Sequence, residues 1–109
     1  MQSAKVVRNS IEVGFLSKED DGKYIFVYTS EYIQNPNTYP ISVNFPKQSE
    51  PFISDYLFSF FTSLLSEGSM KEMQCRSLKI DENDDFSRLL KTATKDTIGS
   101  IIIEEIKSI

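Results

Sequence analysis

The side chains most suited to chemistry lie in one acidic run, Asp81-Glu82-Asn83-Asp84-Asp85. Its first, third and fifth residues match the first three ligands of an EF-hand calcium loop. That loop also requires glycine at its sixth position and glutamate at its twelfth, where this chain has Phe86 and Thr92. We therefore interpret the run as the solvated, acidic start of a helix, and we expect no metal or other cofactor.

The remaining reactive side chains form no recognisable catalytic set. The chain has no histidine, which removes the commonest general base and the commonest metal ligand. Gly22 and Gly68 are isolated, so there is no glycine-rich phosphate loop, and the catalytic motifs of protein kinases are also missing. Cys75, the single cysteine, is interpreted as a small packing residue on a helix. We therefore do not expect an enzyme that acts alone.

Strand patterns dominate the N-terminal half. Ala4–Arg8 and Ile11–Phe15 are rich in β-branched residues and are separated by Asn9-Ser10, a pattern typical of a tight hairpin. Lys23–Tyr28 is apolar on both faces, which predicts a central strand covered on each side. Ile41–Phe45 lies between two prolines, and this position favours an edge strand.

Helical patterns follow. Ser30–Gln34 is predicted to form one helical turn, which the Asn35-Pro36 step ends. The segment from Pro51 to Leu65 is predicted to contain the helix Asp55–Leu65, with Ser54 as its cap, because its large apolar residues recur at the i, i+3, i+4, i+7, i+8 positions of one face. Ser69 and Glu72 match a capping box and predict a second helix that continues to about Leu78.

A third helix and a last strand complete the pattern. Phe86, Leu89, Leu90 and Ala93 share one helical face, with acidic residues at its start and Lys91 and Lys95 near its end. The β-branched segment Ile98–Ile106 is predicted to be the strand that closes the sheet. This order predicts an α+β fold: a small antiparallel sheet with about three helices packed on one face.

Length and composition favour one small domain. The 109 residues are expected to form a single domain over positions 1–109, without a kinase domain. A net charge of −4 argues against direct binding to nucleic acid or to an anionic membrane, because both require a concentrated cationic surface. The apolar runs are too short to cross a bilayer and no secretory signal is visible, so a cytoplasmic protein is expected.

Several spaced features resemble one protein family. Gly14-Phe15-Leu16, the Gly22…Phe26…Tyr28 strand, Pro40–Pro46, Phe60–Gly68 and the segment from Asp85 to Gly99 are together similar to the N-terminal domain of HipA-type toxin kinases. The resemblance covers about Ala4 to Ile103. Phe45, Ser66 and Ser100 replace the family's leucine, proline and alanine, and these changes alter contact details more than the fold.

The resemblance implies a function through a partner. In full-length family members this domain packs against a Ser/Thr kinase, which acts with a helix-turn-helix DNA-binding antitoxin. In split systems of the family, a free-standing N-terminal domain binds the shortened kinase and can neutralise it. The resemblance therefore implies an antitoxin-type subunit whose partners are a HipA-like kinase and, through that complex, the DNA-binding antitoxin.

Two alternatives remain at this level. The chain could be an obligate structural subunit that completes a split kinase, or an N-terminal fragment of a longer HipA-type kinase. In each case, exposed apolar side chains of the predicted helix and the turn after it would contact the kinase. The expected partner-binding residues are Tyr56, Phe58, Ser66, Glu67, Gly68 and Met70.

Overall fold

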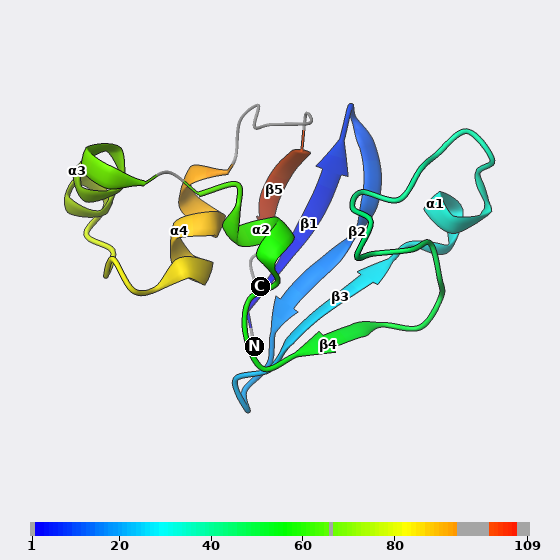
Figure 1. The fold of residues 1–109 in the computed structure, drawn as a ribbon, viewed down its shortest axis with the longest axis horizontal. Coiled ribbons are helices and arrows are strands. Elements are labelled where there is room, and N and C mark those ends of the chain that lie inside the picture. The colour runs from blue at the N-terminus through cyan, green and yellow to red at the C-terminus, as the bar shows by residue number, and fades with distance from the viewer. Residues whose placement is uncertain (1, 66, 94–100, 107–109) are drawn as a thin grey trace.

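The computed structural model describes residues 2–65, 67–93 and 101–106. Along the chain the elements are β1 (Gln2–Arg8), β2 (Ile11–Lys18), β3 (Tyr24–Tyr28), α1 (Ser30–Gln34), β4 (Phe52–Ser54), α2 (Ser59–Thr62), α3 (Gly68–Leu78), α4 (Asp85–Thr92) and β5 (Ile101–Ile106). Figure 1 shows the strands as one twisted sheet with α2 in front of it.

The five strands lie in the order β4-β3-β2-β1-β5, and every neighbouring pair is antiparallel. The predicted hairpin of β1 and β2 is confirmed. Asn9 and Ser10 have φ values of 51° and 69°, which a two-residue turn needs to match the twist of its strands. The predicted α+β class with an antiparallel sheet is therefore confirmed, with β5 as the last strand beside β1.

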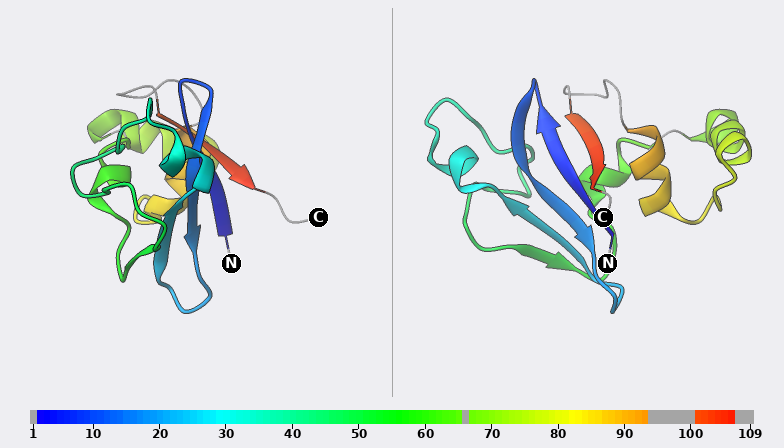
Figure 2. Two further views of the ribbon diagram at one scale, coloured as in Figure 1. Left: turned by 90° about the vertical axis from the view of Figure 1, so that its right-hand side faces the viewer. Right: turned by 180° about the vertical axis from the view of Figure 1, so that it is seen from behind.

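The hydrophobic core lies on one face of the sheet, beneath α2 and α4 (Figure 2). Leu16, Phe26 and Ile103 project from the strands, and Phe86 and Leu89 project from α4 to meet them; all five are fully buried. The number of helices differs from the prediction, because four are present among the described residues. In addition, α3 packs against α4 and stands away from the sheet (Figure 1).

No helix crosses the opposite face of the sheet within the described ranges (Figure 2). The prediction that β3 occupies an interior position is confirmed, because it lies between β4 and β2. The prediction that both its faces are covered is wrong: Phe26 and Tyr28 are buried, whereas Ile25 and Val27 are half-buried on the other face. Cross-strand neighbours such as Phe15, opposite Val27, provide their cover.

The predicted helix Asp55–Leu65 is wrong over most of its length. Phe52–Ser54 forms β4, and only Ser59–Thr62 is helical. Phe52 pairs with Phe26 of β3, and its ring lies 4.9 Å from that of Phe45. Strand pairing and this aromatic contact outweigh a helical periodicity that any apolar segment of similar length can show.

The predicted edge strand Ile41–Phe45 is also wrong. The chain makes a turn there, in which the N–H of Phe45 donates to the carbonyl of Ser42 at 3.0 Å. Ile41 and Phe45 are both buried in the core. A side chain replaces the strand partner, because the backbone N–H of Ile41 donates to the hydroxyl of Tyr28 at 3.2 Å.

The helix ends agree better with the prediction. α1 and α4 form where they were expected, and Asp84 caps α4 by accepting a hydrogen bond from the Ser87 N–H at 3.1 Å. The capping box is wrong, because α3 starts at Gly68 with Glu67 at its N-cap and no side-chain capping bond. Lys95 and the first part of the predicted strand Ile98–Ile106 lie outside the described residues, and the rest forms β5.

Candidate protein-interaction site

Three adjoining hollows lie where the segment from β4 to α2 meets the start of α4. The first, the aromatic hollow, has a volume of about 460 Å³ and is lined by rings, including those of Phe45, Phe52, Phe58, Phe60 and Tyr56. Phe45 forms its floor, because it is buried and its ring centre lies 5.2 Å from that of Phe58. This hollow offers an apolar surface for another side chain.

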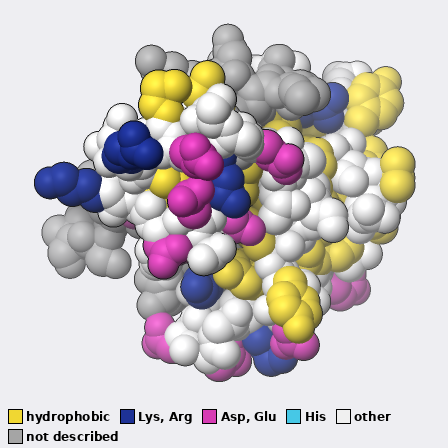
Figure 3. Space-filling model, turned by 60° about the vertical axis from the view of Figure 1, so that its left-hand side comes forward, with side chains coloured by type: hydrophobic (Ala, Val, Ile, Leu, Met, Phe, Trp, Pro, Cys, Tyr) yellow, Lys and Arg dark blue, Asp and Glu magenta, His cyan; other side chains and the backbone are white. Residues whose placement is uncertain are grey.

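The second, the acidic hollow, has a volume of about 600 Å³. Its walls carry the carboxylates of Asp55, Asp81, Asp84 and Asp85, against one lysine, Lys18. Figure 3 shows acidic side chains gathered around basic ones on the side that carries α3 and α4, with apolar side chains exposed nearby. This surface favours a cationic group.

The third, the arginine hollow, has a volume of about 290 Å³ and includes Glu67, Gly68, Lys71 and Arg88 in its walls. Arg88 is only 5% exposed, and its guanidinium lies 3.0 Å from the carboxylate of Asp85. Acidic and basic groups are balanced here, so the hollow favours neither an anion nor a cation by charge alone.

Shared residues make these hollows one continuous surface. Tyr56 and Leu57 line both the aromatic and the acidic hollow. Thr62 and Asp85 line both the acidic and the arginine hollow. A partner segment that enters one hollow therefore meets the next one directly.

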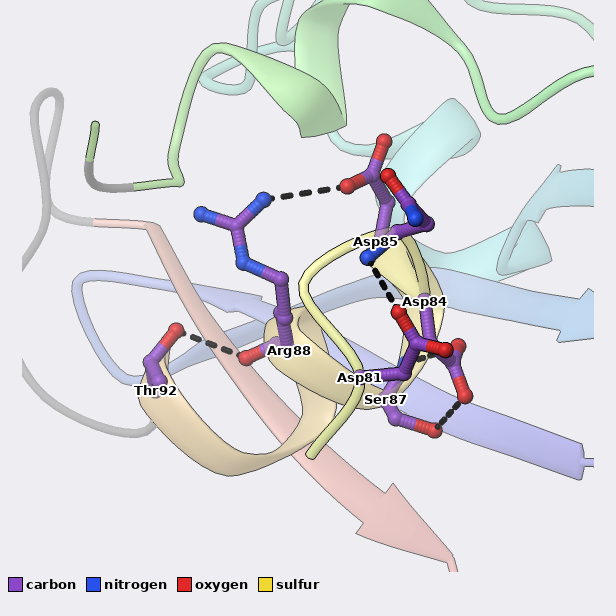
Figure 4. A network of polar contacts seen from close by, with 7 residues as sticks. Asp81, Asp84, Asp85, Ser87, Arg88 and Thr92 are labelled. Atoms are coloured by element: carbon purple, nitrogen blue, oxygen red, sulfur yellow. Dashed lines mark hydrogen bonds and ion pairs between the residues drawn. The ribbon is translucent and has the colours of Figure 1, made fainter. Parts of the chain in front are cut away.

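Hydrogen bonds within the chain hold the acidic residues in place (Figure 4). Asp84 accepts bonds from the backbone N–H and the hydroxyl of Ser87, and Asp81 accepts one from the N–H of Asn83 at 2.8 Å. Among the described residues, Asp81 and Asp84 form no ion pair, whereas Asp85 is paired with Arg88. These two carboxylates therefore keep their charge available to another molecule.

Asp55 joins the end of β4 to the start of β3 through an ion pair. Its carboxylate lies 2.7 Å from the ammonium group of Lys23, which precedes β3. This hydrogen bond, together with the charge of Asp55, raises the pKa of Lys23. Both side chains are exposed, so the pair orients the end of β4 more than it stabilises the fold.

The structure separates the residues that were predicted for partner binding. Tyr56 and Phe58 both line the aromatic hollow. Tyr56 is 81% exposed and available to a partner, whereas Phe58 is half-buried and packs on the core. Glu67 and Gly68 lie together in the arginine hollow. Met70 is half-exposed on α3 outside these hollows, and Ser66 lies outside the described residues.

Two exposed apolar residues were missed by the sequence reasoning. Val43 is 94% exposed in the loop after β3, beside Asn44 of the aromatic hollow, and Ile53 is 61% exposed on β4. Val43 had been placed inside a predicted strand, where an apolar residue is expected to be partly covered, and Ile53 lies just before the predicted helix Asp55–Leu65. The prolines at positions 40, 46 and 51 were the available signal, because they disfavour continuous strands and helices.

Cys75 is buried in α3, in agreement with its interpretation as a packing residue. Within the described ranges, no group of three or more acidic or cysteine side chains is arranged to hold a metal ion. No helix in the described part of the chain combines the length and apolarity needed to cross a membrane.

Comparisons with known proteins agree on one family. The chain matches the model of the HipA N-terminal domain over residues 4–104. An uncharacterized protein of Haemophilus influenzae is 35% identical over 107 residues, which cover 98% of this chain and 95% of that protein. The putative kinase Y4mE of Sinorhizobium fredii is 30% identical over 89 residues, which cover 82% of this chain but 21% of that kinase.

A solved structure supports the same relationship. The N-terminal domain of HipA toxin superposes on the chain with a TM-score of 0.72 at 31% sequence identity. The superposition covers 100% of this chain and 96% of that one, so the similarity includes every element of the fold.

Proposed function

Because this chain belongs to the HipA N-terminal domain family, we propose that it is a non-catalytic module that binds a separately encoded HipA-like Ser/Thr kinase and neutralises or regulates it. The resulting complex would include a helix-turn-helix DNA-binding antitoxin, which the module contacts through the kinase. The protein would act in the cytoplasm, where such a kinase meets its targets.

The observation that carries this proposal is the apolar surface around the aromatic hollow. Val43, Ile53 and Tyr56 are 94%, 61% and 81% exposed, and the hollow, which Ile53, Tyr56 and the chain neighbour of Val43 line, adds further ring surface. Apolar side chains gathered at a concave site are typical of interfaces, in which a few aromatic residues contribute most of the binding energy. A surface of this kind supports protein binding better than catalysis.

The lengths of the relatives also support a separate subunit. The Haemophilus influenzae protein is matched over 95% of its length, as expected if the family includes free-standing domains. The putative kinase is matched over 21%, as expected if the same domain also occurs joined to a larger protein.

The match to the putative kinase also favours the alternative role of a structural subunit. A domain that occurs within a kinase can support its activity by stabilising it, whether it is attached or separate. An N-terminal fragment of a longer HipA-type kinase would carry the same surface. The contacts are the same in each case, so the effect on the kinase must be measured.

Co-expression with a HipA-like kinase, sought among the genes that neighbour the one for this chain, tests the role. Relief of growth arrest is expected if the module neutralises the kinase, whereas arrest that depends on the module would identify a structural subunit. Failure of the two purified proteins to bind would contradict both roles.

Variants of the module test the site in the same binding assay. Tyr56→Ala is expected to weaken binding at least about tenfold, because an exposed ring contributes to binding without supporting the fold. Met73→Ala is the matched control, because Met73 is 57% exposed on α3 and lines none of the three hollows. Glu67→Lys tests the arginine hollow and is also expected to weaken binding. Glu72→Lys is its control, because Glu72 lines none of the three hollows.

A further inference from the structure

The strand β4 lies at one edge of the sheet, so only one side of its backbone is paired. Phe52 and Ser54 are paired with Phe26 and Tyr24 of β3, and no strand of the described residues lies on the other side of β4. An edge strand presents unpaired N–H and C=O groups, which another chain can use to extend the sheet.

The register identifies which residue of β4 presents these groups. The N–H of Thr29 donates to the carbonyl of Val13 at 2.9 Å, one step beyond the Gly14–Tyr28 pair of β2 and β3. Hydrogen-bonded and non-bonded pairs alternate along an antiparallel ladder. Odd-numbered residues of β3 therefore bond to β2, and even-numbered residues turn toward β4.

It follows that Phe52 and Ser54 bond to β3, because their partners are the even-numbered Phe26 and Tyr24. Ile53, between them, directs both its N–H and its C=O away from the sheet. This register gives Ile53 no ladder bond to β3, and among the described residues no bond outside the ladder reaches its backbone. One donor and one acceptor are thus free at the open edge.

The aromatic hollow opens at this same edge. Successive side chains of a strand point to opposite faces, so Phe52 and Ile53 project to different sides of β4. Both nevertheless line the aromatic hollow, so the hollow reaches around the edge of the strand. A backbone that pairs with Ile53 can therefore place a side chain against the rings of Phe45 and Phe58.

The charge beside the hollow indicates what else the bound segment carries. The acidic hollow shares Tyr56 and Leu57 with the aromatic hollow, and it holds the carboxylates of Asp81 and Asp84 without an ion pair among the described residues. A lysine or arginine at one end of the bound segment would meet these carboxylates, whereas an acidic residue would be repelled.

We propose that an extended segment of the partner kinase adds to the sheet beside β4. The segment pairs with the free N–H and C=O of Ile53, inserts a large apolar side chain into the aromatic hollow, and directs a lysine or arginine to Asp81 and Asp84. This inference depends on the proposed function, and it specifies the chemistry of the segment that this module recognises.

Amide hydrogen exchange and two substitutions of Ile53 test the backbone pairing. The probe is the purified HipA-like kinase identified in the co-expression test. On complex formation, the Ile53 amide is expected to exchange at least about tenfold more slowly. Ile53→Pro removes this N–H and Ile53→Thr retains it, while both remove the isoleucine side chain; proline is tolerated because the lost N–H faces outward.

Binding by Ile53→Pro is expected to be about tenfold weaker than binding by Ile53→Thr, and Met73→Ala is the control that keeps wild-type affinity. If the kinase binds but Ile53 exchange is unchanged and the two Ile53 variants bind equally, β-strand addition is wrong and the proposed function stands. If the kinase does not bind the wild-type chain, both are wrong.

The salt dependence of association tests the cation. In the double variant Asp81→Asn, Asp84→Asn, the side-chain oxygens of the asparagines keep the acceptors for the N–H groups of Asn83 and Ser87, and both charges are removed. Association is expected to slow about threefold to tenfold at low salt, and the difference should disappear at high salt. Glu82→Gln is the matched control, because Glu82 lies outside the acidic hollow. An equal effect of both changes would exclude a cation at this position.

Discussion

The hydroxyl of Tyr28 donates a hydrogen bond to the backbone carbonyl of Phe45, and it also accepts one from the N–H of Ile41. One side chain of β3 thereby fixes two backbone groups of a loop that lacks a strand partner. Because Phe45 is the floor of the aromatic hollow, this bond connects the interior of the sheet to the candidate binding surface.

Tyr28→Phe is expected to lower the free energy of unfolding by about 1–3 kcal/mol, because two buried backbone groups lose their partner. Urea unfolding followed by circular dichroism measures the change. Tyr39→Phe is the control, because Tyr39 is largely exposed, and it should leave the unfolding free energy within about 0.5 kcal/mol of wild type. Equal effects of the two variants would contradict this role of Tyr28.

Stability is expected to fall at alkaline pH. Burial raises the pKa of Tyr28 above its ordinary value near 10, although the bond from Ile41 partly opposes this. The unfolded chain therefore loses this proton at lower pH than the folded chain does. The contribution is complete below about pH 10 and is lost as the pH rises through the folded pKa. Above pH 10, the stability of Tyr28→Phe should depend less steeply on pH than that of wild type.

Gly14→Ala is expected to destabilise the sheet by about 1–3 kcal/mol or more. A Cβ atom at Gly14 would lie 2.1 Å from the carbonyl oxygen of Val27, and a backbone atom of a neighbouring strand cannot move away without disturbing the ladder. Thermal unfolding measures the loss. Ser17→Ala, on the same strand, provides the comparison and should have a small effect.

Phe58→Ala and Tyr56→Ala are expected to separate folding from binding. The ring of Phe58 lies 5.2 Å from that of Phe45 and 6.3 Å from that of Phe61, so its removal should cost roughly 1–3 kcal/mol of unfolding free energy. Tyr56 is exposed, and its removal should change the unfolding free energy by less than about 0.5 kcal/mol. A large loss of stability in Tyr56→Ala would show that this ring supports the fold.

The elements that could be predicted from the sequence are those with local causes. The β1–β2 hairpin depends on its two-residue turn, and α4 depends on its cap at Asp84 and its apolar face. The predicted segments around β3 and β5 also form strands, because their β-branched and aromatic residues suit a half-buried sheet. The family resemblance agreed with these elements, and it is confirmed by the match over residues 4–104.

The candidate site could be predicted only in part. Tyr56 and Glu67 are exposed, as the predicted role in binding requires, although Tyr56 was placed on a helix and lies in a bend before α2. The sequence did not indicate that β4 and the loop before it would join them in one surface. Val43 and Ile53 were missed for this reason, since their exposure depends on where the chain leaves regular structure.

The sequence by itself determined the β1–β2 hairpin and the start of α4, because each follows from residues close together in the chain, and the order of its spaced motifs determined the family. Only the tertiary structure decided that Phe52–Ser54 is a strand, that Phe45 lies under the aromatic hollow, and that Ile53 faces outward. The physical reason is that these features depend on pairing with β3 and on the hydroxyl of Tyr28, which are distant in the sequence. Local patterns carry no information about such partners until the chain has folded.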